Sequence, residues 1–359
     1  MTLELHKVAS QVRVMGQSLA DQTAFRETAL TTAQRLLEQV SSEFTALNER
    51  IAQAEKVQQK QRFDWVGAAP TTEALAEAYP LPDCPDRLTV MASDGSQILP
   101  DQHAITLYYL INVGSIIYRH GSDQKPEVYQ PQPVLRYSPE DILDEQGRLI
   151  ASSEVTVRRD LAELEVLAEL AARPSDDEPL IALMDGQITL RVIDLPFHQQ
   201  EIYQNDYIDR LNALREAGVL VGGYIDRPRS TFVLALIHLA ALEVAQITEE
   251  SLRHNQFRTL TDLDLFTFLG PGERSAIFAT KAKGLDKYTY FEQNPHFFYL
   301  NVSNNAFSPQ LARIEIPAWL ASNPDAVDLL HAAIVRQARL TGGYPYVLAR
   351  ADELAIISP

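Results

Sequence analysis

Apolar side chains in the first sixty residues recur at steps of three and four, as at Leu36, Val40, Phe44, Leu47 and Ile51. No proline or glycine interrupts residues 17–62, so the pattern predicts one or two long amphipathic helices between about residues 8 and 61. Prolines at positions 70, 80, 82 and 85 then predict a linker. We therefore expect a coiled-coil-like helical arm and linker over residues 1–85, followed by the main domain over residues 86–359.

The pattern changes in the main domain, where short apolar runs alternate with helical periodicity. Short apolar runs bounded by turn residues predict strands at LTVMAS (88–93), LIALMD (180–185), VLVGGYID (219–226) and, more weakly, at 262–270, 296–303 and 313–320. Residues 104–121 predict an antiparallel hairpin joined near 112–115. Helices are predicted at 155–173, at 231–245, at 325–340 and from Tyr344-Pro345 onward. This alternation indicates an α/β domain built around a mixed sheet with flanking helices.

Charge and cysteine content narrow the function classes. The chain has 48 acidic and 31 basic residues, a net charge of -17, which repels polyanions at long range. DNA binding would therefore need a local basic groove or a partner that delivers the strand. A single cysteine, Cys84, excludes an internal disulfide framework and a cysteine-based zinc site, and favours a reducing, cytoplasmic location. No segment approaches the roughly 20 apolar residues of a membrane span, so no membrane association is expected.

An Asp-Gly pair occurs twice, each time where an apolar strand is predicted to end: Asp94-Gly95 and Asp185-Gly186. If the two strands are neighbours, both carboxylates lie at one edge of the sheet. Mg²⁺ and Mn²⁺ prefer such oxygen ligands, and two ions of this kind can bracket a phosphodiester during attack by water. The alternative is that both are ordinary turn aspartates, because Asp-Gly is a common turn dipeptide.

A third carboxylate is expected from the helix between these strands, where Glu163, Glu165 and Glu169 are candidates. On a helical wheel Glu163 and Glu165 flank the apolar stripe about equally, so periodicity does not choose between them. Arg159 lies one turn before Glu163. Glu163 is therefore either a catalytic ligand oriented by a cation or half of a solvated i,i+4 pair.

Arg227, Arg229 and Ser230 lie in GGYIDRPRS, between a predicted strand and a predicted helix. Arginines and free N–H groups at a helix N-terminus form a phosphate site. Equally, these are surface arginines with Ser230 as the N-cap. His103 and His120 lie near the candidate site and are kept as reserve candidates.

Five segments in order, ASDGS, RRDLAELEVLAELA, LIALMDG, GGYIDRPRS and GGYPYVLARADELAII, together resemble the NurA family of DNA double-strand-break repair nucleases. The resemblance runs from about Leu88 to the C-terminus. It implies a ribonuclease-H-like core and manganese-dependent 5′ to 3′ exonuclease and single-strand endonuclease activity on DNA, with Mg²⁺ as the other candidate ion. It also implies a homodimer and a HerA-type hexameric ATPase as partner in DNA end resection.

In that resemblance Asp94, Glu163 and Asp185 match the metal ligands of a two-metal nuclease, with Glu165 next if the register slips by two. Tyr344 matches the tyrosine of the C-terminal motif, but Asp352 stands where the family has a histidine eight residues later. Asp352 thus adds a fourth carboxylate and changes metal geometry or proton transfer, or lowers activity. Alternatively, Tyr344 and Asp352 are a helix-start aromatic and a surface charge.

Arg227, Arg229, Ser230 and Tyr344 are expected to hold the phosphate or the strand. Two other readings compete with the nuclease. One is a dimeric adaptor of the same fold that binds the ATPase without cutting DNA. The other is a paired-carboxylate glycosidase, which needs no metal; only two tryptophans, Trp65 and Trp319, are present, and neither lies near the motifs.

Overall fold

The computed structural model describes residues 8–61, 63–144, 146–173, 178–305 and 307–357. The chain forms two compact units, each assembled from separate segments. The first contains Met1–Ala78, Arg229–Phe268 and Ser275–Lys283, and the second contains Tyr79–Pro228, Leu269–Arg274 and Gly284–Pro359. The domain boundary after residue 85 is not tested by this grouping and stays a prediction.

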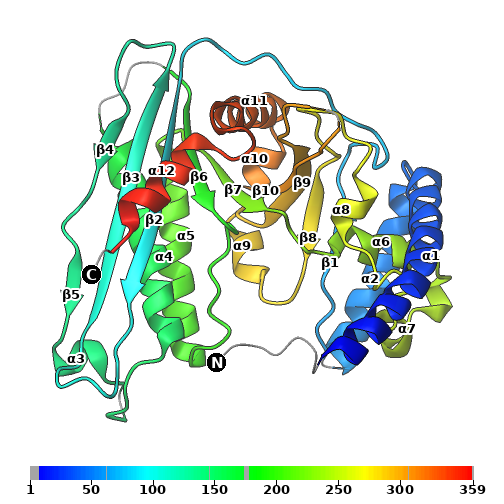
Figure 1. The fold of residues 1–359 in the computed structure, drawn as a ribbon, viewed down its shortest axis with the longest axis horizontal. Helices are drawn as coiled ribbons and strands as arrows, with labels where there is room; N and C mark the ends of the chain where they lie inside the picture. The colour runs from blue at the N-terminus through cyan, green and yellow to red at the C-terminus, as the bar shows by residue number, and fades with distance from the viewer. Residues whose placement is uncertain (1–7, 62, 145, 174–177, 306, 358–359) are drawn as a thin grey trace. The chain divides into compact units, whose positions relative to one another are not determined.

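The first unit is mainly helical (Figure 1). Its elements are α1 (Ala9–Gln39), α2 (Phe44–Gln61), β1 (Gly67–Pro70), α6 (Phe232–Ala240), the 3₁₀ helix η2 (Val244–Gln246), α7 (Glu249–Arg253), α8 (Asp262–Leu265) and β8 (Phe278–Lys281). The prediction of one or two long N-terminal helices is confirmed, and the structure has two, α1 and α2. The predicted strand at 262–270 is wrong. Asp262 there is fully buried and its carboxylate accepts hydrogen bonds from the first-turn N–H groups of Val233 and Leu234 of α6.

The second unit holds most of the sheet (Figure 1). Its strands are β2 (Leu88–Ile98), β3 (Tyr109–His120), β4 (Glu127–Tyr129), β5 (Val134–Arg136), β6 (Leu180–Asp185), β7 (Leu220–Asp226), β9 (Pro295–Asn301) and β10 (Leu311–Pro317). Its helices are α3 (Pro139–Ile142), α4 (Ser152–Ala171), α5 (Phe197–Glu216), α9 (Asp286–Tyr290), α10 (Ala318–Ala321), α11 (Pro324–Thr341) and α12 (Tyr346–Ala355).

The strand order of this unit is β9-β10-β7-β6-β2-β3-β4, and β5 also pairs with β3. β6 is parallel to both β2 and β7, whereas β3 and β10 join their neighbours antiparallel. The predicted mixed α/β sheet with flanking helices is therefore confirmed. Parallel neighbours need a crossover, and α4 and α5 provide the crossovers from β2 toward β6 and from β6 to β7.

Two predicted strand boundaries are wrong. β2 does not end at Asp94, because it continues to Ile98 and pairs with β3 along its whole length. Likewise, residues 109–120 form one continuous strand with no turn at 112–115, so the hairpin is β2–β3. Cross-strand pairing over eleven residues outweighs the local turn preference of Asp-Gly and of Gly114.

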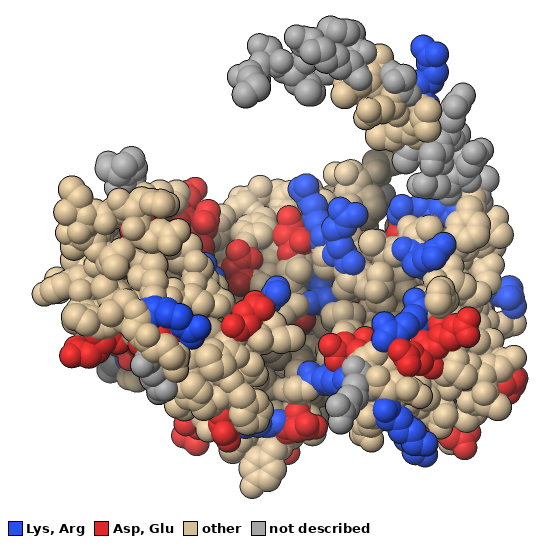
Figure 2. All heavy atoms as spheres, turned by 90° about the horizontal axis from the view of Figure 1, so that it is seen from below, with Lys and Arg blue, Asp and Glu red and all other residues tan. Residues whose placement is uncertain are grey.

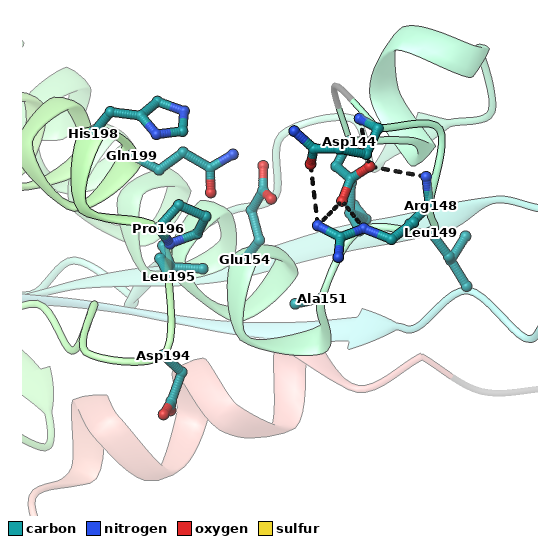
Figure 3. Close-up of a pocket in the computed structure, with 12 residues that line it drawn as sticks. Asp144, Arg148, Leu149, Ala151, Glu154, Asp194, Leu195, Pro196, His198 and Gln199 are labelled. Atoms are coloured by element: carbon teal, nitrogen blue, oxygen red, sulfur yellow. Dashed lines mark hydrogen bonds and ion pairs between the residues drawn. The ribbon is translucent and has the colours of Figure 1, made fainter.

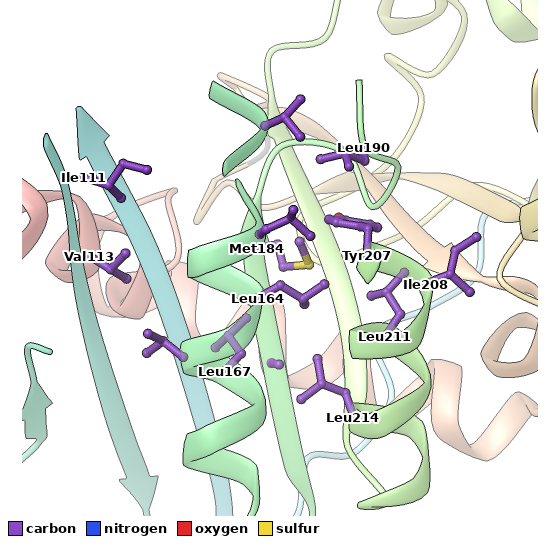
Figure 4. Packing of buried hydrophobic residues seen from close by; sticks show 14 of the residues in the cluster. Ile111, Val113, Leu164, Leu167, Met184, Leu190, Tyr207, Ile208, Leu211 and Leu214 are labelled. Atoms are coloured by element: carbon purple, nitrogen blue, oxygen red, sulfur yellow. The ribbon is translucent and has the colours of Figure 1, made fainter. Parts of the chain in front are cut away.

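α4 and α5 cover the sheet with apolar side chains, as Figure 4 shows. Leu164 and Leu167 of α4 face Met184 of β6, while Leu211 and Leu214 of α5 belong to the same buried cluster. Burying such a side chain contributes about 1.5–3 kcal/mol, so this layer fixes the position of α4 on the sheet. In the described part of the chain, no helix is long and apolar enough to cross a membrane.

Candidate metal-dependent active site

The candidate site is built on the alternation of side chains along β2. Ser93, Gly95 and Gln97 face α4: Ser93 Oγ donates to the Glu163 carbonyl at 2.8 Å and Gln97 donates to Thr156 at 3.0 Å. A Cβ at Gly95 would lie 2.6 Å from Glu163 Oε1. Gly95 is therefore needed because α4 approaches the strand closely, and not because the chain turns there.

Asp94 and Ser96 project to the opposite face, toward α12. Ser96 donates a hydrogen bond to the carbonyl of Ala355, the last residue of α12, and Asn112 donates to the same oxygen at 2.8 Å. Gly114, which pairs directly with Asp94, has no room for a Cβ because the Leu354–Ala355 backbone lies 2.6 Å away. These contacts hold α12, and with it Asp352, against β2 and β3.

Carboxylates from the two faces meet because β2 is longer than its neighbour. The β2–β6 register stops at Ser93–Met184, and β6 ends one residue later at Asp185. Beyond that point the β6 side of β2 is no longer paired in the sheet. Glu163 on one face, Asp94 on the other and Asp185 at the strand end are therefore brought together, as the sequence predicted for Asp94 and Asp185.

The electrostatics show that these side chains interact. The pKa of Asp94 is raised to about 6, chiefly by loss of hydration. The charges of Asp185 and Asp352 contribute to this rise, and the hydrogen bond from the Gly95 N–H, at 2.8 Å, opposes it. Burial also raises the pKa of Glu163 well above its ordinary value, Arg159 opposes this, and Asp160, Asp94 and Asp185 add to it. Crowded carboxylates with raised pKa values are typical of functional sites.

Asp185 is exposed, but its pKa is raised as well, first by lost hydration and then by Asp352 and Asp226. The Tyr344 hydroxyl donates a hydrogen bond to its carboxylate, which lowers that pKa. Tyr344 is also packed edge-on against Tyr224, at 5.1 Å between ring centroids. The structure thus joins Tyr344 and Asp352 to the three predicted ligands.

Hydrogen bonds to β7 and β10 fix the backbone that follows Asp185. Gly186 has φ +102°, and its N–H donates to the Tyr224 carbonyl at 2.8 Å. Ile188 N–H donates to Glu315 Oε2 at 3.1 Å, and Arg313 donates to the other Glu315 oxygen at 2.7 Å. Glu315 and Arg313 are both buried, so this network anchors the loop that carries Asp185.

The helix carboxylate at the site is Glu163. Its side chain is 15% exposed and lies against β2, whereas that of Glu165 is 55% exposed and pairs with Arg210 at 3.2 Å. Glu169 is exposed and accepts from Tyr129. Geometry therefore separates Glu163 from Glu165, which helical periodicity left equal.

The predicted phosphate-binding residues fall in different units. Arg227, at the end of β7, is in the second unit with φ +43°, and its side chain is 78% exposed. Arg229 and Ser230 belong to the first unit. The N-cap of α6 is Thr231 and not Ser230, and Asp262 already accepts from first-turn N–H groups of α6. That helix N-terminus therefore gives the phosphate-site prediction no support.

Neither reserve histidine gains support. His103 is exposed, and His120 is buried and hydrogen-bonded to Gln337 at 2.8 Å. Burial lowers the pKa of His120 to about 4.

Sequence reasoning did not assign three charged groups to the site. Arg159 was considered only as a cation that orients Glu163, yet its charge acts on Asp94, Glu163 and Asp185. Asp160 is the hydrogen-bond partner of Arg159, at 2.7 Å. Asp226 ends β7, beside β6, and its charge raises the pKa of Asp185. The sequence did show Asp226 as a third strand-end aspartate.

The donor chemistry fits a hard divalent cation. All the candidate ligands are carboxylates, and Glu163 Oε1 is buried without a hydrogen-bond partner. The side-chain positions are not closed around an ion, however: among the residues that the structure describes, no three His, Cys, Asp or Glu side chains are arranged to hold one.

A separate cavity of about 490 Å³ lies at the start of α4. Figure 3 shows Glu154 and Gln199 among its lining residues. Its charges are already paired: Arg148 donates to Asp144 at 2.8 Å, and Glu154 accepts from Arg158 at 2.7 Å. This cavity therefore offers no cluster comparable to the one at Asp94.

Comparison with known proteins decides the family. The sequence profile of the NurA domain matches residues 88–357. The chain belongs to the NurA family. Membership of this family implies a nuclease of DNA repair, and the matched NurA domain contains every residue of the acidic cluster.

The other comparisons add little. No curated protein matches the NurA-family chain. Among solved structures, an Argonaute of Aquifex aeolicus is similar with a TM-score of 0.31 and 10% identity. The similarity covers 76% of this chain and 29% of the Argonaute chain, so this chain spans less than a third of that structure.

Proposed function

We propose that this NurA-family protein hydrolyses DNA phosphodiester bonds, as a 5′ to 3′ exonuclease and single-strand endonuclease, during DNA end resection. The observation that supports this proposal most strongly is the meeting of Asp94, Glu163 and Asp185 where β6 ends beside β2. In this proposal the three carboxylates hold Mn²⁺ or Mg²⁺. Such an ion lowers the pKa of the attacking water and offsets charge on the leaving oxygen.

A ribonuclease-H-like core is part of the proposal. β4 and β5 both pair with β3, and counting them as one interrupted third strand makes β2 the first strand and β6 the fourth. The proposed ligands then lie on the first strand, on the long helix before the fourth strand, and at the end of the fourth strand. The family resemblance implies an Asp at the end of the first strand, a Glu on the first helix and an Asp at the end of the fourth strand, and this chain differs in that β2 continues past Asp94.

The chain's own residues have separate roles in the proposal. Tyr344 orients Asp185 through its hydroxyl, and Asp352 supplies a further negative charge beside Asp94 and Asp185. Arg227, exposed at the end of β7, is placed to contact a phosphate. The roles of Arg229 and Ser230 remain predictions from sequence.

The surface charge favours delivery of DNA by a partner. On the face seen in Figure 2, Lys and Arg side chains alternate with Asp and Glu and form no broad basic stripe. With a net charge of -17, capture of DNA from solution is disfavoured. We therefore propose that a homodimer of this protein works with a HerA-type hexameric ATPase, which supplies the strand.

The alternative is a dimeric adaptor that binds the ATPase without cutting DNA. Two points favour it: the family resemblance implies a histidine where this chain has Asp352, and among the described residues no three His, Cys, Asp or Glu side chains are arranged to hold a metal ion. A cleavage assay separates the two functions. The purified protein is incubated with end-labelled single- and double-stranded DNA in Mn²⁺, Mg²⁺ or EDTA, with and without the ATPase, beside Asp94→Ala.

Metal-dependent cutting by the wild type that Asp94→Ala abolishes supports the nuclease. If no DNA is cut in any condition, including those with the ATPase, the nuclease proposal fails and the adaptor takes its place.

A further inference from the structure

Arg159 is the cation that the acidic cluster faces. Its Nε lies 3.1 Å from Glu163 Oε1, and its terminal nitrogen lies 2.7 Å from Asp160 Oδ1. The charges of Asp94 and Asp185 also act on it. One guanidinium therefore lies within the field of four carboxylates, three of which are the proposed metal ligands.

The two nearest carboxylates hold Arg159 in different ways. Asp160 accepts two hydrogen bonds from it, at 3.2 and 2.7 Å. Glu163 Oε1 is close to Nε, but the contact lacks hydrogen-bond alignment, and this buried oxygen has no other partner. Asp160 thus orients the guanidinium, while Arg159 faces Glu163 Oε1 through charge, without a hydrogen bond.

Packing keeps Arg159 at this place. A Cβ on Gly95 would lie 2.7 Å from Arg159 Cγ and 3.1 Å from its Cδ, so the aliphatic part of the side chain lies directly on β2. The side chain is 29% exposed, which leaves the guanidinium a route toward solvent. Arg159 is therefore close enough to the carboxylates to neutralise them, and its guanidinium has a solvent-exposed side toward which it can be displaced.

We infer that Arg159, held by Asp160, is an internal counter-ion of the Asp94–Glu163–Asp185 cluster that a divalent cation must displace in order to bind. This inference rests on the proposed function, because it concerns the same metal ligands. Two cations that share the same carboxylates repel each other, and a binding equilibrium is weakened by any competitor that occupies the site first. Arg159 thus lowers the affinity of the site for metal while it keeps the metal-free carboxylates together.

The test measures Mn²⁺ binding, not DNA cleavage. Isothermal titration calorimetry compares the full-length wild type with Arg159→Gln, Arg159→Lys and Arg210→Gln. Arg210 is a matched control, since it also pairs with carboxylates of α4 and α5, Glu165 and Asp206, but not with the cluster. Arg159→Gln is expected to bind Mn²⁺ about tenfold more tightly, which lies within the roughly 5–150-fold range typical of coupling between two bound groups.

The two controls separate charge from other causes. Arg159→Lys keeps the positive charge, and is expected to bind within about threefold of the wild type; Arg210→Gln is expected to match the wild type. If Arg159→Gln does not fold, Arg159→Met keeps the aliphatic packing on Gly95 and gives the same test.

Equal or weaker Mn²⁺ binding by the Arg159 variant overturns the inference, as does an absence of binding in both proteins. Detectable binding by the variant alone supports it. The proposed function fails separately, if the wild type cuts no DNA.

Discussion

Asp94→Asn is expected to stabilise the metal-free protein. Asparagine has nearly the same shape as aspartate, and its side-chain oxygen can still accept the hydrogen bond from the Gly95 N–H. The substitution removes only the negative charge of Asp94. In the folded protein this charge is incompletely hydrated and is repelled by the charges of Asp185 and Asp352. A site shaped for a cation should be less stable without one.

The size of the effect follows from the pKa. Folding raises the pKa of Asp94 from 3.8 to about 6, which corresponds to about 3 kcal/mol at about 1.4 kcal/mol for each pKa unit. Asp94 is only partly buried, so solvent screening reduces the expected gain to about 1–2 kcal/mol. The folded state binds the proton more tightly, so wild-type stability falls as pH rises from about 4 to 6 and stays lower above that.

Urea unfolding in EDTA, at pH 7.5 and at pH 4, measures both parts of this prediction. Asp94→Asn should exceed the wild type in free energy of unfolding at pH 7.5, and the difference should shrink at pH 4. Asp144→Asn is the control of opposite sign, because hydrogen bonds from Arg148 lower the pKa of Asp144 and its charge is stabilising. If Asp94→Asn is no more stable than the wild type at pH 7.5, the electrostatic reasoning is refuted.

Three further substitutions test the supporting structure. Gly95→Ala places a methyl group 2.6 Å from a carboxylate oxygen of α4, and should reduce the rate of DNA cleavage at least about tenfold. Gly16→Ala is the control, because Gly16 has open space around it, and should leave the cleavage rate unchanged. Glu315→Ala leaves the buried Arg313 without its carboxylate and should lower the free energy of unfolding in urea by about 3–5 kcal/mol. A decrease below about 1 kcal/mol would contradict the role of this network in anchoring the loop after Asp185. Burial lowers the pKa of His331 to about 4, so stability should fall by about 2 kcal/mol between pH 7 and 5 as the unfolded state gains a proton, and His331→Gln should remove that part of the slope.

The elements that could be predicted from sequence are those with strong internal periodicity. α4 and α11, and the strands β6 and β7, lie where apolar spacing placed them. Segments whose conformation depends on distant partners could not be predicted. Asp94-Gly95 has the composition of a turn, and only the pairing with β3 and the closeness of α4 show why it is a strand.

The residues of the candidate site also fall into those that could be predicted from the sequence and those that could not. Asp94 and Asp185 were predictable because each comes at the end of an apolar run in the sequence. The choice of Glu163 over Glu165 required knowledge of which side of α4 faces β2. The position of Asp352 required the contact of Ala355 with Ser96 and Asn112, which joins residues more than 240 positions apart and leaves no local pattern.

The central claim is that one carboxylate of α4, and not its neighbour two residues on, belongs to the active site. The most direct measurement compares Glu163→Gln with Glu165→Gln in Mn²⁺-dependent cleavage of end-labelled single-stranded DNA, beside the wild type. We predict that Glu163→Gln loses at least about a hundredfold in rate, the usual cost of removing a group that stabilises the transition state, while Glu165→Gln retains wild-type activity. Equal rates for Glu163→Gln and the wild type would contradict the assignment of the site.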